Sequence, residues 1–588
     1  MRWAVGLALI FGVSNLINFA HGSVFAVGAY LGLAAITFVG TPLPVTLLLV
    51  AVGCGLLGML IERVGLRPLA GSARIAPLLA TIGISFVLDQ LIQLVASPDP
   101  RGLPAQVPSW RITVGGGTVG ALDLLIALIG IGTTALLFVF LRYSKLGWAV
   151  RAVAQDRDAA LQMGVDADRV NSTVFAIAGA LGGVAGLLVG IYYNHIDPGM
   201  SFQATLKGVV AQVIGGMGRI PGAVVGGLLL GLAESFGGAV FGSSARNLFA
   251  FGLLLAMLAF RPQGLFGGRR TTAVEPLTGS FIAPSRPVRV PFWVLAIAFV
   301  APAGVPFVAD DYTLQVMAGA WLYGILALSL TLVAGTLGLV SLGQAGLFAI
   351  GAYASALLAT DGQVPVLVAI PVAGVITAVL GTLIIAPAFR LRGQTVSIAT
   401  LGVGEIVGLV ILNWDSLTHG PIGVSRIPPP ELFGIDLGSA SALYWLSLGL
   451  LALLGGGLSR LLGSHLGRTF RAVRDDDVAA QAFGVRPWRC KAMGFAVGGG
   501  LAGMSEAVRA HSYSYINHET FTSQISILAL TMVILGGLGN LVGAVVGAVA
   551  LVALPEMFRF TAEYCVLVYG LVLLLLVRFR PQGLFGTV

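Results

Sequence analysis

Long apolar runs alternate with shorter polar segments along the whole chain. Most of the apolar runs hold about 20 residues, which is the length that a helix needs to cross a hydrocarbon core about 30 Å thick. The pattern therefore predicts a series of membrane-spanning helices, about 16–20 segments in total. The polar segments between them are the expected loops.

The apolar pattern is itself repeated, because five blocks of sequence occur twice in the same order. The offset between the copies stays between 319 and 323 residues. A repeat of this kind indicates a duplicated structural unit. We predict two homologous halves, 1–267 and 290–588, joined by a polar linker at 268–289. The paired blocks are 15–30 with 338–353, 80–83 with 399–402, 147–165 with 467–485, 214–226 with 535–547, and 260–267 with 579–586.

The predicted spans follow the apolar runs of each half. In the first half they lie near 2–19, 23–40, 43–61, 76–97, 119–141, 170–193 and 245–260. In the second half they lie near 291–308, 313–334, 338–357, 364–386, 395–413, 440–462, 492–510 and 563–577. The regions 206–233 and 524–553 are ambiguous, since glycines interrupt both. Two half-helices of about 12 residues would reach about 18 Å each, so a re-entrant element is expected there.

Composition agrees with an all-α, polytopic transmembrane helical bundle. The chain is 57% hydrophobic and 10% charged, whereas a soluble domain has about 25% charged residues. Its 82 glycines suit tight helix crossings, because small residues let the backbones of membrane helices approach closely. The three cysteines have no spacing typical of a metal site or a disulfide framework.

The net charge of +8 indicates membrane orientation rather than nucleic-acid binding. Lys and Arg gather in the cytoplasmic loops of membrane proteins. Six polar segments hold 23 of the 33 Lys and Arg residues, and we place all six in the cytoplasm. The two halves then share one orientation and form a parallel repeat. The segments are 61–74, 142–169, 261–289, 390–392, 468–491 and 578–580.

Polar side chains interrupt one apolar block of each half. LINFAHGSVFAVGAY in the first half and LVSLGQAGLFAIGAY in the second place them at equivalent positions. Polar groups in hydrocarbon are costly and usually face the bundle interior or a cavity. They therefore either line a transport pathway or hydrogen-bond between closely packed helices, and a proton relay through the histidine is a weaker alternative. The residues are Asn18, His21, Ser23, Ser341 and Gln344.

Further pathway candidates lie in the spans around 76–97 and 395–413. Glu405 is the costliest group of the second half, and the first half has Phe86 there, with Asp89 one turn further on. Either carboxylate would pair with the backbone or a loop arginine, or lie at the pathway wall. Thr81 and Thr400 precede glycines, and their hydroxyls either line the pathway or bond within their own helix.

Two charged loops, 142–169 and 465–491, keep one pattern across the duplication. An Arg-Ala-Val triplet, acidic residues, an alanine pair and a Gly-Val pair follow at the same distances, which predicts a short surface helix ended by glycine. A merely solvated loop has no need to keep this pattern, so we favour a docking helix for a cytoplasmic partner. Its residues are Arg151, Ala152, Asp156, Ala159 and Gly164, with Arg471, Ala472, Asp476, Ala479 and Gly484.

These blocks resemble a known family. GWAVRAVAQDRDAALQMGV is similar to the coupling loop of ATP-binding-cassette (ABC) importer permeases. LINFAHGSVFAVGAY, ERVGLRPLAGSARIAPLLATIG and IPGAVVGGLLLGLAE resemble the LivH-type permease subunit of branched-chain amino acid importers. LVSLGQAGLFAIGAY, LRGQTVSIATLGVGEIVGLVILNW, LTHGPIGV and LGGLGNLVGAVVG resemble its LivM-type partner. The chain is thus similar to a fusion with the LivH-type half first.

The resemblance implies an importer permease for branched-chain amino acids, multi-pass in the bacterial plasma (inner) membrane. It implies two cytoplasmic ABC ATPase subunits and a periplasmic or lipoprotein substrate-binding protein as partners, with no nucleic acid. Importers of urea and short amides look similar, so the substrate stays open. The chain has no Gly-x-x-x-x-Gly-Lys-Ser/Thr loop to cradle ATP, so hydrolysis is expected on separate subunits. We expect no cofactor, no metal and no enzymatic activity of its own.

Two other classes stay open at this point. A secondary transporter driven by an ion gradient would need no docking helices, and a membrane-embedded enzyme would need a clustered nucleophile, base and acid that the sequence does not display. The sequence departs from the family pattern in three places. Asn18 follows Met1 after only 17 residues, where the family has a longer first helix; Gln394 and Thr395 replace an aromatic residue; and His518 stands where the family more often has proline.

Overall fold

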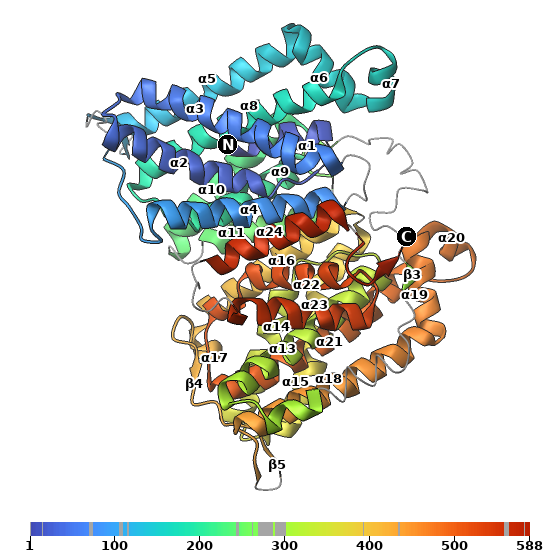
Figure 1. The fold of residues 1–588 in the computed structure, drawn as a ribbon. Helices are drawn as coiled ribbons and strands as arrows, with labels where there is room; N and C mark the ends of the chain where they lie inside the picture. The colour runs from blue at the N-terminus through green and yellow to red at the C-terminus, as the bar shows by residue number, and fades with distance from the viewer. Residues whose placement is uncertain are drawn as a thin grey trace. The chain divides into compact units, whose positions relative to one another are not determined.

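The computed structural model describes most of the chain as helix (Figure 1). Nearly all of the linker 268–289, and residues 291–301 of the span expected near 291–308, lie outside the described residues. The described residues are 2–14, 16–69, 75–104, 110–114, 117–242, 246–261, 263–267, 286–287, 302–391, 393–432, 435–557, 564–580 and 582–587.

The described residues form two compact units. The first unit holds most of the first half, and its boundary falls inside helix α10, after Ala233. Its helices are α1 (Arg2–Ser14), α2 (Ala20–Phe38), α3 (Leu43–Leu60) with the turns η1 (Ile61–Leu66) and η2 (Arg67–Leu69), α4 (Ile75–Ala96), α5 (Ala121–Tyr143), α6 (Lys145–Gln155), α7 (Arg157–Gln162), α8 (Ala167–Tyr193), α9 (Met200–Gly215), α10 (Ile220–Phe241) and α24 (Cys565–Phe579). A hairpin of β1 (Arg111–Val114) and β2 (Gly117–Gly120) precedes α5.

The second unit repeats this series. Its helices are α11 (Arg246–Phe260), η4 (Val305–Phe307), α13 (Asp311–Leu330) with η5 (Thr331–Thr336), α14 (Gln344–Thr360), α15 (Val366–Ile385) with η6 (Ala386–Arg390), α16 (Gln394–Asn413), α17 (Asp415–Thr418), α18 (Ala440–Gly463), α19 (His465–Asp475), α20 (Asp477–Ala482), α21 (Pro487–Tyr513), η7 (His518–Phe521), α22 (Ser523–Gly536) and α23 (Leu541–Met557). Two-residue strands form three antiparallel pairs, β3 (Arg286–Pro287) with β8 (Gly586–Thr587), β4 (Val424–Ser425) with β7 (Tyr515–Ile516), and β5 (Glu431–Leu432) with β6 (Ile435–Asp436).

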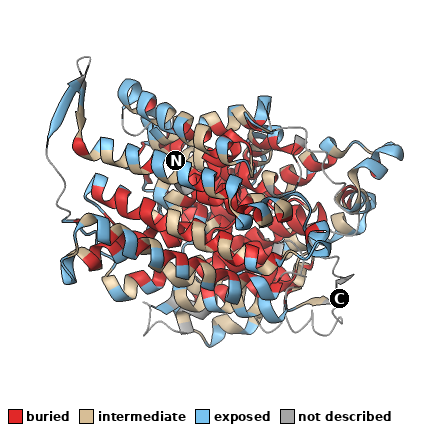
Figure 2. Cartoon of the chain, turned by 90° about the horizontal axis from the view of Figure 1, so that it is seen from above, coloured by how far each residue is buried: buried red, intermediate tan, exposed pale blue. Residues whose placement is uncertain are grey.

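The all-α, polytopic prediction is confirmed. Within the described residues, 11 helices are long and apolar enough to span a membrane, and five further apolar helices are 10–17 residues long. Burial differs along them, as the red and pale blue positions of Figure 2 show. Helix α8 is buried along most of its length, whereas α5 exposes large apolar side chains such as Leu128 (72%) and Leu136 (70%), as expected of a face turned to lipid.

The expected pair of 12-residue half-helices is wrong. Helices α9 and α10 have 16 and 22 residues, which correspond to about 24 and 33 Å. Their counterparts α22 and α23 have 14 and 17 residues. The error arose because α9 begins at Met200, upstream of the apolar run that the sequence offers. The glycine break separates two helices instead of dividing one span.

The glycine break also explains the motif FRPQGLFG, which occurs unchanged in both halves. Gly216 and Gly537 end α9 and α22 with φ of +108° in each case, a conformation that only glycine adopts readily. Within the first copy, the Leu265 and Phe266 amides donate to carbonyls at the end of α9 at 2.9 and 3.0 Å. Leu584 and Phe585 do the same at the end of α22 at 2.9 and 3.1 Å. The repeated motif is therefore a structural cap.

One close helix crossing in each unit joins two glycines. A Cβ atom added to Gly28 in α2 would lie 2.3 Å from the Cα of Gly183 in α8. In the second unit, a Cβ added to Gly351 in α14 would lie 2.3 Å from the Cα of Gly503 in α21. No side chain fits at such a distance, so the crossing depends on glycine.

The last helix of each sequence half packs in the unit built by the other half. Helix α24 belongs to the first unit, where a Cβ on Gly570 would lie 2.8 Å from the Gly83 carbonyl oxygen of α4. Helix α11 belongs to the second unit, where Leu254 approaches Gly402 of α16. Gly83 and Gly402 are equivalent in the repeat, so the exchange is reciprocal. Compact units and sequence halves therefore differ by these two helices and by the last part of α10, which begins at Glu234.

A substitution at the α2–α8 crossing tests its importance. We expect Gly28→Ala to lower the free energy of unfolding by about 1–3 kcal/mol, because the added methyl group overpacks a backbone contact. Gly132→Ala in α5 is the matched control, since nothing lies within 4 Å of a Cβ atom there. Thermal unfolding of the purified protein measures both variants. Equal melting temperatures for the two would contradict the tight-crossing account.

Candidate transport and docking sites

The polar stretch of each half lies at an interruption between helices. Helix α2 starts at Ala20 and α14 at Gln344, so that Asn18 and Ser341 stand in non-helical backbone just before them. The expected spans near 2–19 and 338–357 therefore each include an interruption. A glycine, Gly338, opens the second one with φ of +73°.

Threonines from a neighbouring helix hold both interruptions. The Phe19 amide donates to Thr81 Oγ1 at 3.2 Å, and the Leu342 amide donates to Thr400 Oγ1 at 3.0 Å. Each threonine hydroxyl also donates to a carbonyl of its own helix, three residues earlier. These hydroxyls satisfy backbone N–H groups that the first turn of a helix leaves without a partner.

The side chains at the interruptions are enclosed. Seven candidate pathway residues are at most 3% exposed: Asn18, His21, Ser23, Thr81, Ser341, Gln344 and Thr400. The His21 ring occupies space that two glycines leave, since a Cβ on Gly6 would lie 2.9 Å from its Nε2 and one on Gly182 would lie 3.0 Å from its Cε1. Gln344 Oε1 accepts a hydrogen bond from Ser329 Oγ at 3.5 Å.

Some polar atoms at these interruptions have no hydrogen-bond partner among the described residues. They are Asn18 Oδ1, Gln344 Nε2 and, close to the first interruption, Asp89 Oδ1. Buried polar atoms are nearly always hydrogen-bonded, so such atoms call for an explanation. They are places where a polar substrate or water would find a partner.

Serine hydroxyls hold the two carboxylates of the spans. Ser201 Oγ donates to Asp89 Oδ2 at 2.9 Å, and Ser523 Oγ donates to Glu405 Oε1. Ser201 and Ser523 are equivalent in the repeat and stand in the first turns of α9 and α22. Asp89 lies one helical turn beyond the position that is equivalent to Glu405 in the repeat. Each carboxylate nevertheless accepts a hydrogen bond from the equivalent serine. The sequence offered a backbone group or a loop arginine as partner, and the serines were missed.

The two charged loops that share one sequence pattern each form a pair of helices, α6–α7 in the first half and α19–α20 in the second. We call them the docking pairs. Asp156 caps α7 by accepting from the Ala159 amide at 3.0 Å, and Asp476 caps α20 by accepting from the Ala479 amide at 3.0 Å. Such caps are worth about 1 kcal/mol each. The predicted surface helices are therefore present, and two of their acidic candidates act as caps.

Glycine ends the second helix of each docking pair, as the sequence predicts. Gly164 and Gly484 have φ of +82° and +80°, and the next residue donates back to Ala160 or Ala480 at 3.0 and 3.1 Å. This is the left-handed glycine stop that closes many helices. Its consequence is a protruding apolar residue just before the glycine, Met163 at 84% exposure and Phe483 at 89%.

The remaining docking candidates lie along the same surfaces. Arg151, Ala159 and Gly164 are exposed in the first pair, as are Ala472, Ala479 and Gly484 in the second. Arg471 is half-buried and donates to the Leu462 carbonyl at 3.2 Å. A cavity of about 580 Å³ lies beside the first pair, with Arg142 and Arg151 in its lining.

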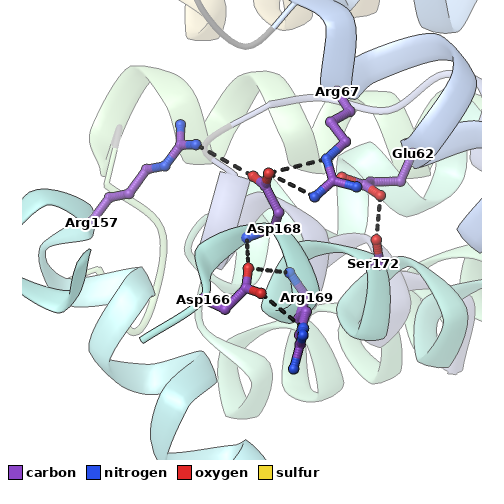
Figure 3. A network of polar contacts seen from close by, with 7 residues as sticks. All are labelled: Glu62, Arg67, Arg157, Asp166, Asp168, Arg169 and Ser172. Atoms are coloured by element: carbon purple, nitrogen blue, oxygen red, sulfur yellow. Dashed lines mark hydrogen bonds and ion pairs between the residues drawn. The ribbon is translucent and has the colours of Figure 1, made fainter. Parts of the chain in front are cut away.

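An ion-pair network fixes the first docking pair to neighbouring helices (Figure 3). Asp168, at the start of α8, pairs with Arg67 of η2 at 2.7 Å and with Arg157 of α7 at 3.9 Å. Ser172 of α8 donates to Glu62 of η1. Asp168 was not predicted as a functional residue, although it lies in the charged loop 142–169. No group of three or more metal-ligating side chains occurs among the described residues.

Known proteins are similar to the chain in both halves. The family model described as "Branched-chain amino acid transport system / permease component" matches residues 3–258 and 312–577. The high-affinity branched-chain amino acid transport system permease protein BraD of Pseudomonas aeruginosa is 36% identical over 276 residues, which cover 45% of this chain and 90% of BraD.

Two further relatives carry the same description as permease proteins of a high-affinity branched-chain amino acid transport system. LivM of Salmonella typhimurium is 33% identical over 339 residues, which cover 53% of this chain and 80% of LivM. LivH of Escherichia coli is 34% identical over 278 residues, which cover 45% of this chain and 90% of LivH. Each relative thus matches about half of this chain.

The serine–carboxylate pairs generate a stability prediction. We expect Ser201→Ala and Ser523→Ala each to lower the free energy of unfolding by about 1–3 kcal/mol, because a half-buried carboxylate loses a hydrogen-bond donor. Ser512→Ala is the control, since that hydroxyl donates only within its own helix, to the Val508 carbonyl. Melting temperatures that shift equally in all three variants would rule out the proposed pairing.

Proposed function

Because the chain belongs to the family of branched-chain amino acid transport system permease components, as a fusion of two such components, we propose that it is the permease of an ABC importer. In this proposal it carries branched-chain amino acids across the bacterial inner membrane. ATP hydrolysis takes place on two separate ATPase subunits, one bound at each docking pair. A substrate-binding protein delivers the amino acid at the other face.

The observation that carries this proposal is the duplication of the docking pair. Both copies have the same aspartate cap, the same glycine stop and one apolar side chain that protrudes from the tip, Met163 or Phe483. An apolar side chain this exposed suits insertion into an apolar groove of a partner. Two equivalent tips on one chain suit two equivalent subunits.

A route from docking pair to pathway is available in the second half. Arg474 of α19 donates through Nη1 to the Gly335 carbonyl at 3.0 Å. Gly335 lies in the last turn of η5, shortly before the interruption that holds Ser341. A movement of the docking pair imposed by ATP binding would therefore reach the interruption through a single hydrogen bond, and would open enclosed polar groups to the substrate.

The polar groups along the proposed pathway suit a substrate that is a zwitterion with an apolar side chain. The interruptions offer amides and hydroxyls within an apolar bundle, and only isolated carboxylates accompany them. A substrate handed over by a binding protein needs weak contacts, which such groups supply. Urea and short amides are the alternative substrates, and a secondary transporter driven by an ion gradient is the alternative class.

Uptake by proteoliposomes tests this proposal. The chain is reconstituted with its ATPases and binding protein, and entry of labelled leucine, isoleucine, valine and urea is followed. ATP-dependent entry of the three amino acids is the expected result. Entry of urea alone would show that the substrate is urea and not an amino acid. Uptake by the chain without ATPases, under a proton or sodium gradient, would overturn the importer proposal.

The protruding apolar tips give a second prediction. We expect Met163→Asp combined with Phe483→Asp to abolish co-purification of the ATPases and to reduce ATP-dependent uptake at least tenfold, because a buried unpaired charge would oppose docking. Met163→Leu with Phe483→Leu is the matched control and keeps both activities. Retention of the ATPases by the aspartate variant would show that docking occurs elsewhere.

The polar interruption before α2 gives a third prediction. Replacing Asn18 by Ala and His21 by Leu should reduce uptake at least tenfold, while the protein remains membrane-inserted with its ATPases bound, if these side chains meet the substrate. Gly132→Ala again supplies an unperturbed comparison. Unchanged uptake together with a lower melting temperature would assign both residues to helix packing alone.

A further inference from the structure

A charged pair lies within α21, towards the end that is remote from the docking pair α19–α20. The helix has 27 residues from Pro487, a length of about 40 Å, and the pair lies in its last third. Arg509 Nε donates to both carboxylate oxygens of Glu506 at 2.9 Å, and Nη2 lies 2.8 Å from Oε1. Glu506 is 1% exposed, and an ionised group buried this deeply is costly unless it is paired.

The first half shows that the shared fold does not require this pair. At the equivalent positions α8 carries Gly186 and Val189, at the same offset as the docking pairs. Both helices nevertheless make the same glycine crossing, through Gly183 and Gly503. The charged pair is therefore an addition to the second half. The first half makes the same crossing without it, so the fold alone does not require the pair.

Aromatic rings and a cavity surround the pair. The Arg509 guanidinium carbon lies 5.4 Å from the ring centre of Tyr323 and 5.9 Å from that of Tyr513. Arg509 Nη1 also donates to the Tyr323 hydroxyl at 3.0 Å. A cavity of about 370 Å³ opens beside these groups, a size typical of small-molecule sites. Its lining is Glu506, Arg509, Ala510, Tyr513, Tyr515, Ile516 and Thr520.

The pair has hydrogen-bonding capacity beyond its internal contacts. A guanidinium carries five N–H donors and a carboxylate about four acceptor positions. Nε, Nη1 and Nη2 of Arg509 each make a contact described above, and each Nη carries a second N–H. A donor fork and an acceptor of opposite charge therefore stand side by side at one cavity wall. That arrangement matches a ligand with a carboxylate and an ammonium group on one carbon.

We infer that this cavity binds the backbone of a zwitterionic α-amino acid, with its carboxylate at Arg509 and its ammonium group at Glu506. The ligand's apolar side chain lies against Ala510, Ile516 and the tyrosine rings. This inference rests on the proposed function, because its ligand is the transported amino acid. It also makes the second half the one that selects amino acids over neutral urea.

The test measures how ligands change the melting temperature of the purified chain, without a binding protein. Leucine, 4-methylpentanoate, which lacks the amine, and 3-methylbutylamine, which lacks the carboxylate, are titrated separately. The wild-type protein should be stabilised by leucine at concentrations at least tenfold lower than by either analogue. The double variant Glu506→Gly with Arg509→Val reproduces the residues of α8 and should lose the leucine response.

A second variant tests the same cavity in case the double variant does not fold. Thr520→Phe narrows the cavity from η7 without altering the ion pair and should also weaken the leucine response at least tenfold. A leucine response that is unchanged in the folded variants overturns the inference. So does the absence of any response in wild-type protein that still imports leucine with ATP. Wild-type protein that imports no amino acid would instead overturn the proposed function.

Discussion

The glycine-on-glycine crossing of α2 with α8, repeated by α14 with α21, is the contact on which the rest of each unit depends. A Cβ atom at Gly28 or Gly351 would approach the partner backbone to 2.3 Å, so each helix pair is locked at one separation and one register. Each helix of the crossing adjoins a candidate site. The first is preceded by the polar interruption, and the second continues directly from the docking pair. The crossing thus connects the point where a partner would push to the point where a substrate would pass.

The duplication separates what the fold needs from what one half adds. Threonine-held interruptions, serine-held carboxylates, glycine stops and the PQGLFG caps occur in both halves with nearly the same geometry, and they form the shared transport scaffold. The Asp168 network occurs only in the first half among the described residues. At the position equivalent to Asp168, the second half has Trp488. The Glu506–Arg509 pair occurs in the second. The halves therefore combine one scaffold with two specialisations, as expected of a fusion of two different permease components.

Sequence patterns predicted the helices well, because a membrane span is a local property of about 20 residues. The docking pairs were also predictable, since the duplication preserved caps and glycines at fixed spacing. The start of α9 was missed because its first residues include polar side chains such as Ser201 and Gln203, which shorten the apolar run. The exchange of α11 and α24 left no local signal, since it depends on contacts between helices far apart in sequence. Glu506 and Arg509 were overlooked, although both charges lie within the predicted span near 492–510.

We propose that this single chain presents two equivalent docking sites for ATPase subunits. Native mass spectrometry of the chain, purified together with its ATPases from a membrane that contains all components, tests this most directly. We expect one copy of the chain with two ATPase subunits, and one fewer subunit when the tip of only one docking pair is replaced by aspartate. A chain that carries no ATPase, or keeps both after either substitution, would contradict it.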